Sequence, residues 1–284
     1  MATTTLSSSM GLIALLKEKD ERLQRYGLQE LDRVVEIFWF EIADALRRIE
    51  AFSEDPDFKD AKQAALLASK VYFHLGEADE ALRLALAADE LFYKDTYKLY
   101  KDFITGKGVD VYRSQQHARR HGTAAEKDQL GPIDPRLEAM VNKIFEQCIA
   151  LGQYKEALGI AIECRRTDVI KDTIRRAGGE GVSLMGYCES VGRTLVQSRG
   201  YRNELLRTLF QLYSAAGQPD YVAMCQCLIS LEDPQEVAAI LNQLVDAEGE
   251  LYSAAGQPDY VAMCQCLISL EDPQEVAAIL NQLV

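Results

Sequence analysis

Cysteine pairs are the first candidates for chemistry in this sequence of 284 residues. Cys225 and Cys227 flank a single glutamine, and Cys264 and Cys266 repeat the arrangement. Zinc sites generally use cysteines about two to four residues apart, commonly on a turn. Here the surrounding pattern is helical, and a helix would point two thiols at this spacing about 200° apart. We therefore expect these cysteines to pack in a core and predict no metal site.

Histidines are the second candidates, as bases or as ligands, and the sequence has three of them. His117 and His121 are four residues apart, but no carboxylate or thiol pattern surrounds them. His74 lies just before Gly76, where we expect it to interact with carbonyl groups at a helix end. A nucleophilic Cys/His pair would need a cysteine close to His74 or His121 in the fold, and no motif indicates one.

Phosphate-binding and metalloprotease motifs are missing from the sequence, which has no Walker-type loop, no GxGxxG after a strand and no HExxH. The glycine-rich segment 178–181 follows a helix, so it indicates a turn. Arg165-Arg166 and Arg175-Arg176 are expected to pair with nearby acidic side chains, with contact to an acidic partner as the alternative. The sequence therefore predicts no enzyme, with no catalytic, cofactor-binding or metal residues and no small-molecule substrate.

Composition limits the partners. The formal net charge of −13 argues against nucleic acid, since phosphate binding requires a basic face. No apolar run reaches the roughly 18 residues that span a bilayer, and no basic residue precedes the short apolar stretch near the N-terminus. The seven cysteines are an odd number, which fits a reducing compartment. We expect a soluble protein of the cytoplasm and nucleus with neither nucleic acid nor membrane as partner.

A duplication dominates the organisation of the chain. Residues 251–284 repeat residues 212–245 without one substitution, at an offset of 39 residues. A period near 40 is typical of stacked helical hairpins. The copies are identical, however, and their boundary falls inside a helix that residues 202–211 begin. These features indicate a recent genetic duplication, or a splicing or assembly event, superimposed on an older helical array.

Helical hairpins are the recurrent unit. Residues 75–85 align with residues 151–161, and residues 216–225 are a weaker relative. In each, a helix is expected to end at a glycine that can adopt the left-handed cap conformation, namely Gly76, Gly152 or Gly217. A second helix should begin three or four residues later and press small side chains against the first: Ala81, Ala85, Ala157 and Ala161. We predict an all-α, armadillo-like solenoid of helical hairpins without a sheet.

Caps and prolines predict the remaining boundaries. Residues 7–9 are three serines that should cap a first helix, and a longer helix should stop near Asp55-Pro56. Residues 105–135 lack clear periodicity, so we expect an exposed loop near 115–131. Pro132 and Pro135 then lead into a helix over 136–151, with Asp134 as its cap.

The domain organisation follows from these boundaries. We assign residues 1–245 to one N-terminal helical solenoid. Residues 246–284, a short joining segment plus the duplicate, are expected to continue it. Apolar spacing also predicts a single helix over residues 235–255, across the copy junction.

Several segments in combination resemble a known family, although each alone is merely helical. They are residues 6–16, 63–76, 133–143, 154–166 and 221–234. In this order they are similar to the N-terminal region of the 26S proteasome non-ATPase regulatory subunit 1 family. The members of that family are the largest scaffold subunits of the regulatory particle base. The resemblance covers essentially residues 6–245.

The resemblance implies a noncatalytic scaffold and regulator that supports ubiquitin-dependent protein degradation through contacts with other proteasome regulatory-particle subunits. In that family a helical rod precedes a toroid of repeats and a tail that recruits a ubiquitin receptor. Neither lies in this sequence, so no residue-level binding site transfers. The alternatives are a free-standing helical-repeat adaptor that binds peptides on its concave face, or a truncated, nonfunctional gene product. In the truncated form we expect aggregation or dimerisation through an apolar face of Val276, Ile279, Leu280, Leu283 and Val284.

Overall fold

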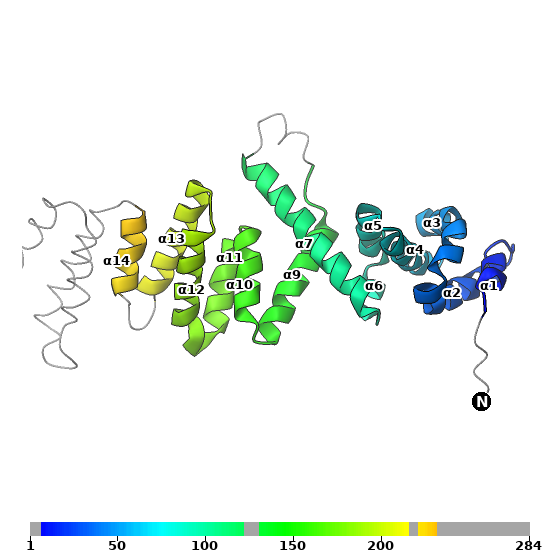
Figure 1. Cartoon of the computed structure of the whole chain (residues 1–284), viewed down its shortest axis with the longest axis horizontal. Helices are drawn as coiled ribbons and strands as arrows, with labels where there is room; N and C mark the ends of the chain where they lie inside the picture. Colours follow the sequence, from blue (N-terminus) through cyan, green and yellow to red (C-terminus); the bar gives the residue numbers. More distant parts are fainter. Residues whose placement is uncertain (1–6, 122–130, 216–220, 232–284) are drawn as a thin grey trace, which may run out of the picture. The chain divides into compact units, whose positions relative to one another are not determined.

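The computed structural model describes residues 7–121, 131–215 and 221–231 (Figure 1). Every regular element in these ranges is a helix, and none of their residues is in a strand. The chain divides into two compact units, Met1–Ile144 and Phe145–Val284. In both, consecutive helices joined by short turns pack against each other. The predicted all-α, armadillo-like solenoid class is therefore confirmed.

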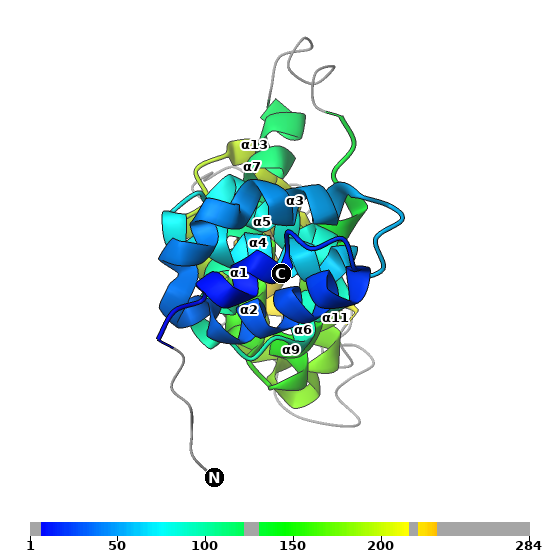
Figure 2. The ribbon, with the colours of Figure 1, turned by 90° about the vertical axis from the view of Figure 1, so that its right-hand side faces the viewer.

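The first unit is built from short and medium-length helices, with α1 lying against α2 at the N-terminal side (Figure 2). Its elements are α1 (Met10–Leu15), α2 (Glu21–Ile42), the 3-10 turn η1 (Ala43–Ala45), α3 (Leu46–Glu54), α4 (Ala61–Leu75), α5 (Ala78–Ala88), α6 (Glu90–Lys94), α7 (Lys98–His121) and the first part of α9 (Pro135–Ala150). The most extensive contact is between α4 and α5, which also meet α3 and α7 respectively.

In the second unit, too, consecutive helices pack against each other. After the end of α9 it contains α10 (Tyr154–Glu163), α11 (Thr167–Arg176), the 3-10 turn η2 (Gly178–Glu180), α12 (Gly181–Thr194), α13 (Arg199–Ser214) and α14 (Tyr221–Ser230). The turn η2 occupies the glycine-rich segment where a turn was predicted. No helix among the described residues of either unit is long and apolar enough to cross a membrane.

Two of the three predicted glycine caps are confirmed. Gly76 ends α4 with φ 82°, and Gly152 follows α9 with φ 71°. In the first hairpin the N–H of Glu77 donates to the carbonyl of Tyr72 at 3.0 Å, and in the second Gln153 donates to Cys148 at 2.8 Å. These are the bonds of a Schellman cap, which reverses the chain in so few residues that α5 and α10 begin two residues after the glycine. The predicted gap of three or four residues was therefore too long.

Small side chains sit where the paired helices touch. All four predicted contact alanines are at most 1% exposed: Ala81, Ala85, Ala157 and Ala161. An alanine adds no side-chain bulk beyond Cβ, so helix axes can approach closely without a rotamer-rich side chain being immobilised. The third predicted cap, Gly217, lies outside the described residues.

The N-terminal helix is held differently from the prediction. Ser9 occupies the cap position of α1, but its side chain caps no helix N–H. Instead the Ser8 and Ser9 hydroxyls donate to the Glu41 carboxylate at 2.9 and 2.7 Å, and the Ser9 N–H donates to it at 2.6 Å. Only Ser8 has a capping role, because its Oγ accepts from the Met10 N–H at 3.2 Å. These bonds, from Ser9 first, lower the pKa of Glu41.

The long helix after it ends near Asp55-Pro56 as predicted, since α3 stops at Glu54. It is not continuous, however. Phe38 leaves helical geometry at φ −108° and ψ 18°, and the 3-10 turn η1 separates α2 from α3. The interruption changes the direction of the chain without using a glycine or a proline, which is why the spacing pattern gave no sign of it.

The first part of the predicted loop near 115–131 is helical instead, because α7 continues to His121. Tyr100, Ile104, Gly108 and Tyr112 recur at every fourth residue and are all buried. A Cβ at Gly108 would lie 2.9 Å from Sδ of Met140 in α9, so this glycine marks a close approach of two helices. Glycine has a low helix propensity, and at Gly108 tertiary packing outweighs it.

The helix after the loop is close to the prediction. It begins at Pro135, and the Asp134 carboxylate accepts from the Arg136 N–H at 2.9 Å, as expected of the cap. Residues 122–130, the junction helix over 235–255, the duplicate within 246–284 and its apolar end lie outside the described residues. The assignment of residues 1–245 to one helical solenoid and its extension through 246–284 both stay predictions.

Two glycine-to-alanine substitutions should have opposite effects on stability. Gly76→Ala places a Cβ on a left-handed backbone, and we expect it to lower the free energy of unfolding by about 1–2 kcal/mol. Gly106→Ala lies in α7 with no atom within 4 Å of the new Cβ, so it should raise that free energy by up to about 1 kcal/mol. Urea denaturation measures both, and shifts of the same sign would contradict the cap assignment.

Candidate functional site

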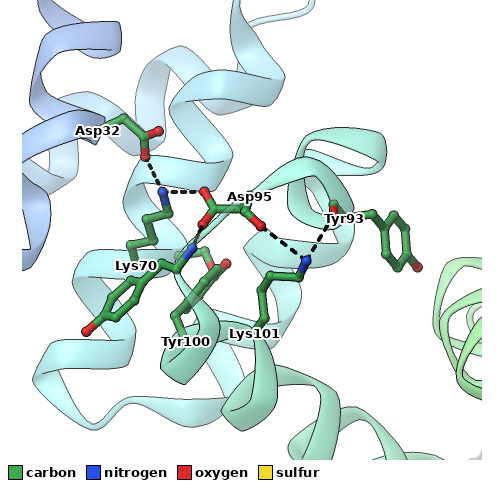
Figure 3. A network of polar contacts seen from close by, with 8 residues as sticks. Asp32, Lys70, Tyr93, Asp95, Tyr100 and Lys101 are labelled. Atoms are coloured by element: carbon green, nitrogen blue, oxygen red, sulfur yellow. Dashed lines mark hydrogen bonds and ion pairs between the residues drawn. The ribbon is translucent and has the colours of Figure 1, made fainter.

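A buried lysine lies at the centre of the first unit. The Lys70 side chain, in α4, is 4% exposed. Its Nζ is 2.8 Å from Oδ1 of Asp32 in α2 and 2.5 Å from Oδ2 of Asp95, which follows α6 (Figure 3). One cation thereby joins α2, α4 and the turn that leads into α7.

Local sequence forces this arrangement. Residues 64–71 of α4 are all buried, so the lysine at position 70 loses its water as the helix packs. A desolvated ammonium is costly unless it meets anions and hydrogen-bond acceptors. Asp95 is itself oriented, because its Oδ1 accepts from the Tyr97 N–H at 2.7 Å. Its carbonyl oxygen accepts from Lys101 Nζ at 3.1 Å, and Lys101 also donates to the Tyr93 carbonyl at 3.0 Å.

A neutral hydrogen-bond chain runs beside the ionic contacts. Ser69 Oγ donates to the Ala81 carbonyl at 2.5 Å and lies 2.6 Å from the Tyr100 hydroxyl. Since the serine proton is committed to Ala81, the tyrosine hydroxyl donates to Ser69. This chain joins α4, α5 and α7. We call Asp32, Ser69, Lys70, Asp95 and Tyr100 together the α4 network.

The electrostatics of the α4 network are those of a fixed ion pair. Burial raises the pKa of Asp32, and the attraction of Lys70 only partly offsets this effect. Burial alone would lower the pKa of Lys70, but Asp32 and Asp95 outweigh it and raise the pKa. Burial also raises the pKa of Tyr100. The ammonium stays charged between two carboxylates, so the network stabilises the packing of four segments.

A cleft of about 380 Å³ lies elsewhere in the same unit, between α5–α6 and α9. Its lining is largely apolar and includes charged side chains of both signs. The lining residues are Ala85, Leu86, Asp89, Glu90, Phe92, Tyr93, Pro135, Arg136, Ala139, Met140 and Lys143. Asp89 adopts φ 54° and pairs with Lys62 at 2.8 Å, and Lys143 Nζ lies 3.4 Å from the centre of the Tyr93 ring. A mixed rim over apolar walls suits a protein side chain better than a phosphate.

An apolar stripe runs along the solvent face of α2. Leu23, Tyr26, Ile37 and Phe40 are 40%, 54%, 69% and 55% exposed. Helical spacing puts Leu23, Tyr26 and Ile37 on one side of α2, opposite its buried residues. The Glu30–Arg33 ion pair lies between Tyr26 and Ile37 on this side, and Phe40 follows the kink at Phe38. We call these four residues the α2 outer stripe. Grouped exposed apolar side chains are characteristic of protein–protein contact surfaces.

The sequence analysis considered two cysteine pairs and three histidines as candidates for chemistry and predicted no metal site. Cys225 and Cys227 are fully buried in α14, in agreement with core packing, and no disulfide joins the described cysteines. No group of three or more possible metal ligands occurs among the described residues. The second pair, Cys264 and Cys266, lies outside them. His117 and His121 are both in the last turns of α7, where we had expected a loop.

His74 belongs to an aromatic cluster. Its ring stacks on Trp39 with centroids 5.5 Å apart and on Tyr97 at 5.9 Å, and it meets Phe73 edge-on at 5.1 Å. Its Nε2 is buried without a hydrogen-bond partner, which does not fit the expected interaction with helix-end carbonyls at that atom. Burial lowers the pKa of His74, with Glu36 opposing the effect. The imidazole therefore acts as a neutral aromatic ring.

The arginine pairs largely behave as predicted. Arg166 contacts Asp168 at 2.7 Å, and Arg176 contacts Glu146 and Asp172, both at 2.8 Å. The Arg165 guanidinium lies 4.9 Å from the centre of the Tyr201 ring, a cation–π contact that the sequence did not predict. These contacts tie arginines to nearby elements of the second unit.

The α4 network and the α2 outer stripe were both missed in the sequence. A lysine inside the otherwise apolar run of residues 64–71 is a visible signal of a buried charge. Its partners are distant in sequence and have no motif. The α2 outer stripe gave no separate signal in the sequence. The buried residues on the opposite side of α2 are enough to predict an amphipathic helix, so the exposed apolar residues were not singled out.

Comparisons with known proteins agree on one family. The family model of the N-terminal domain of the 26S proteasome subunit RPN2 matches residues 7–257. The 26S proteasome non-ATPase regulatory subunit 1 of Drosophila melanogaster is 40% identical over 240 residues, 84% of this chain and 23% of the relative. Homolog B of that subunit in Arabidopsis thaliana is 39% identical over 87% of this chain and 24% of its own length. The regulatory subunit RPN2 of Candida glabrata is 35% identical, over 86% and 26% respectively. The chain thus spans about a quarter of the length of these curated relatives.

Removing the buried cation should destabilise the first unit in a pH-dependent way. Lys70→Met leaves two facing carboxylates without a counter-ion, and we expect the free energy of unfolding to fall by about 3–5 kcal/mol at pH 7. The pKa of Asp32, already raised in the folded protein, should rise further in the variant. Because the folded state then holds a proton more tightly than the unfolded state, the deficit should shrink as the pH falls toward about 4. Urea denaturation at the two pH values measures this.

Lys62→Met is the matched control, since it removes a lysine–aspartate pair whose side chains are 60% and 55% exposed. Water screens such a pair, so little change is expected at either pH. A Lys70→Met protein as stable as the wild type at pH 7 would refute the role of the α4 network.

Proposed function

The chain belongs to the family of the RPN2 N-terminal domain of the 26S proteasome, and from this premise we propose that it is a noncatalytic scaffold of the proteasome regulatory particle base. In this proposal it supports ubiquitin-dependent protein degradation by protein–protein contacts with other regulatory-particle subunits. It acts in the cytoplasm and the nucleus, where it regulates the particle without a reaction, cofactor or small-molecule substrate of its own.

The family match carries the proposal. The curated relatives are named as regulatory subunits, and similarity extends over 84–87% of this chain in three of them. Since the chain corresponds to only about a quarter of those proteins, their whole activity is not assigned to it. What is proposed is the contribution of an N-terminal helical segment to holding neighbours in place.

Two features of the first unit support a scaffold mechanism. The α4 network fixes α2, α4, α5 and the start of α7 relative to one another through charged and neutral hydrogen bonds. The α2 outer stripe exposes apolar side chains on a helix that this network anchors through Asp32. A rigid element that presents apolar surface loses little conformational entropy on binding, which favours a permanent contact.

The direct test is a tagged pull-down of this chain from eukaryotic cells, with the recovered proteins identified by mass spectrometry. We expect proteasome regulatory-particle subunits. Recovery of chaperones alone would contradict the scaffold role and favour a nonfunctional fragment. Recovery of other proteins without proteasome subunits would contradict it in favour of a free-standing adaptor.

The α2 outer stripe can be tested in the same experiment. Ile37→Asp combined with Phe40→Asp should lower the recovery of regulatory-particle subunits by about tenfold, which corresponds to ~1.4 kcal/mol of binding free energy. Both side chains are more than half exposed, so the thermal midpoint should not change.

Leu195→Asp is the matched control, because Leu195 is a 71%-exposed apolar residue after α12 in the second unit. We expect wild-type recovery from this variant. Equal loss from both variants would show that the effect is not specific to the α2 outer stripe.

A further inference from the structure

The helix α14 packs on the chain through side chains that leave solvent almost completely. Five of its apolar residues are at most 8% exposed: Ala223, Met224, Cys225, Cys227 and Leu228. Among the described helix pairs of the second unit, α13 and α14 make the most extensive contact. Arg193 of α12 adds one polar contact, since its Nη2 donates to the Gln226 carbonyl at 2.9 Å. We call α13 and Arg193 together the α14 seat.

The chain encodes the sequence of α14 twice but the sequence of α13 once. Residues 260–269 have the same ten letters as Tyr221–Ser230, and the identity extends through the surrounding 34 residues. The buried side chains of α14 all have counterparts: Ala262, Met263, Cys264, Cys266 and Leu267. Residues 199–211, which form most of α13, have none, because the duplicated block begins at Leu212. Two identical segments therefore match a single seat.

We propose that residues 260–269 bind the α14 seat in exchange with Tyr221–Ser230 of the same chain. Identical side chains make identical apolar contacts with α13. The polar contact does not distinguish the segments either, because Arg193 bonds to a main-chain carbonyl that Gln265 supplies in place of Gln226. The contact free energies of the two occupants are therefore equal, and only the connecting segments differ.

The lengths of these connections set the populations. Six residues, 215–220, join α13 to Tyr221, whereas the 45 residues 215–259 join it to Tyr260. The probability of loop closure falls as about the three-halves power of length, which favours the first copy by about twenty-fold. The second copy occupies the seat in about one molecule in twenty, and it takes over wherever the first copy is disabled.

Three variants of the full chain test the exchange: Cys225→Arg, Cys264→Arg and the two together. An arginine at the fully buried position 225 cannot be accommodated in the seat. With the second copy as replacement, hydrogen-exchange protection of α13 amides should fall by about twenty-fold in Cys225→Arg and remain unchanged in Cys264→Arg. The double variant should lose far more. A Cys225→Arg protein as unprotected as the double variant would overturn the proposal, and so would a double variant as protected as the wild type.

Gln226→Arg is the matched control, since it adds the same charge at an exposed neighbouring position of α14 and should leave protection unchanged. A second readout identifies the occupant. Met224 is 5% exposed, and in Cys225→Arg it should become reactive to hydrogen peroxide while Met263 becomes protected. Oxidation of both methionines would overturn the proposal. Dilution should not alter either result, because dependence on protein concentration would assign the replacement to a second molecule.

Discussion

The ammonium of Lys70 is removed from water where α2, α4 and the start of α7 meet, and the first unit is organised around satisfying it. Two carboxylates are needed because one buried pair rarely recovers the cost of desolvating both ions. Their positions are in turn fixed by main-chain contacts, such as the bond from the Tyr97 N–H to Asp95. The interaction adds less net stability than its short distances suggest. Its larger effect is to select one arrangement of these helices, since any other leaves a buried charge unpaired.

The hairpins follow a different rule from the α4 network. At Gly76 the chain reverses through a left-handed cap, and Ala81 and Ala85 then let α5 approach α4 closely. Such contacts depend on local sequence and on shape alone. They can therefore recur along a chain, as they do at Gly152, and each repeat needs only its neighbours. Apolar hairpins supply burial, and sparse polar contacts determine which hairpins are neighbours.

The difference between local hairpin contacts and long-range polar contacts explains which features could be predicted from the sequence. The caps at Gly76 and Gly152 and the buried alanines are encoded within about ten residues, so pattern analysis found them. The α4 network was missed because Asp32 and Asp95 are far from Lys70 in sequence, and only the fold brings them together. The lack of clear periodicity that the sequence shows from residue 105 onward has a related cause. Gly108 resembles a helix breaker by propensity, but it lies where Met140 of α9 approaches α7, a contact that no local window contains.

Specificity differs between the two units for the same physical reason. In the first, a displaced segment would have to reproduce a charged side chain at one position, as Asp32 does. In the second, the contact of α14 with α13 and Arg193 includes buried apolar side chains and a main-chain carbonyl. A main-chain acceptor carries no sequence information, and apolar packing accepts any segment of the same shape. A surface of this kind has no means of discriminating between two identical copies, so chain connectivity alone distinguishes them. Duplication of such a segment is tolerated energetically, whereas duplication of α2 would place a second carboxylate in competition for a single buried ammonium.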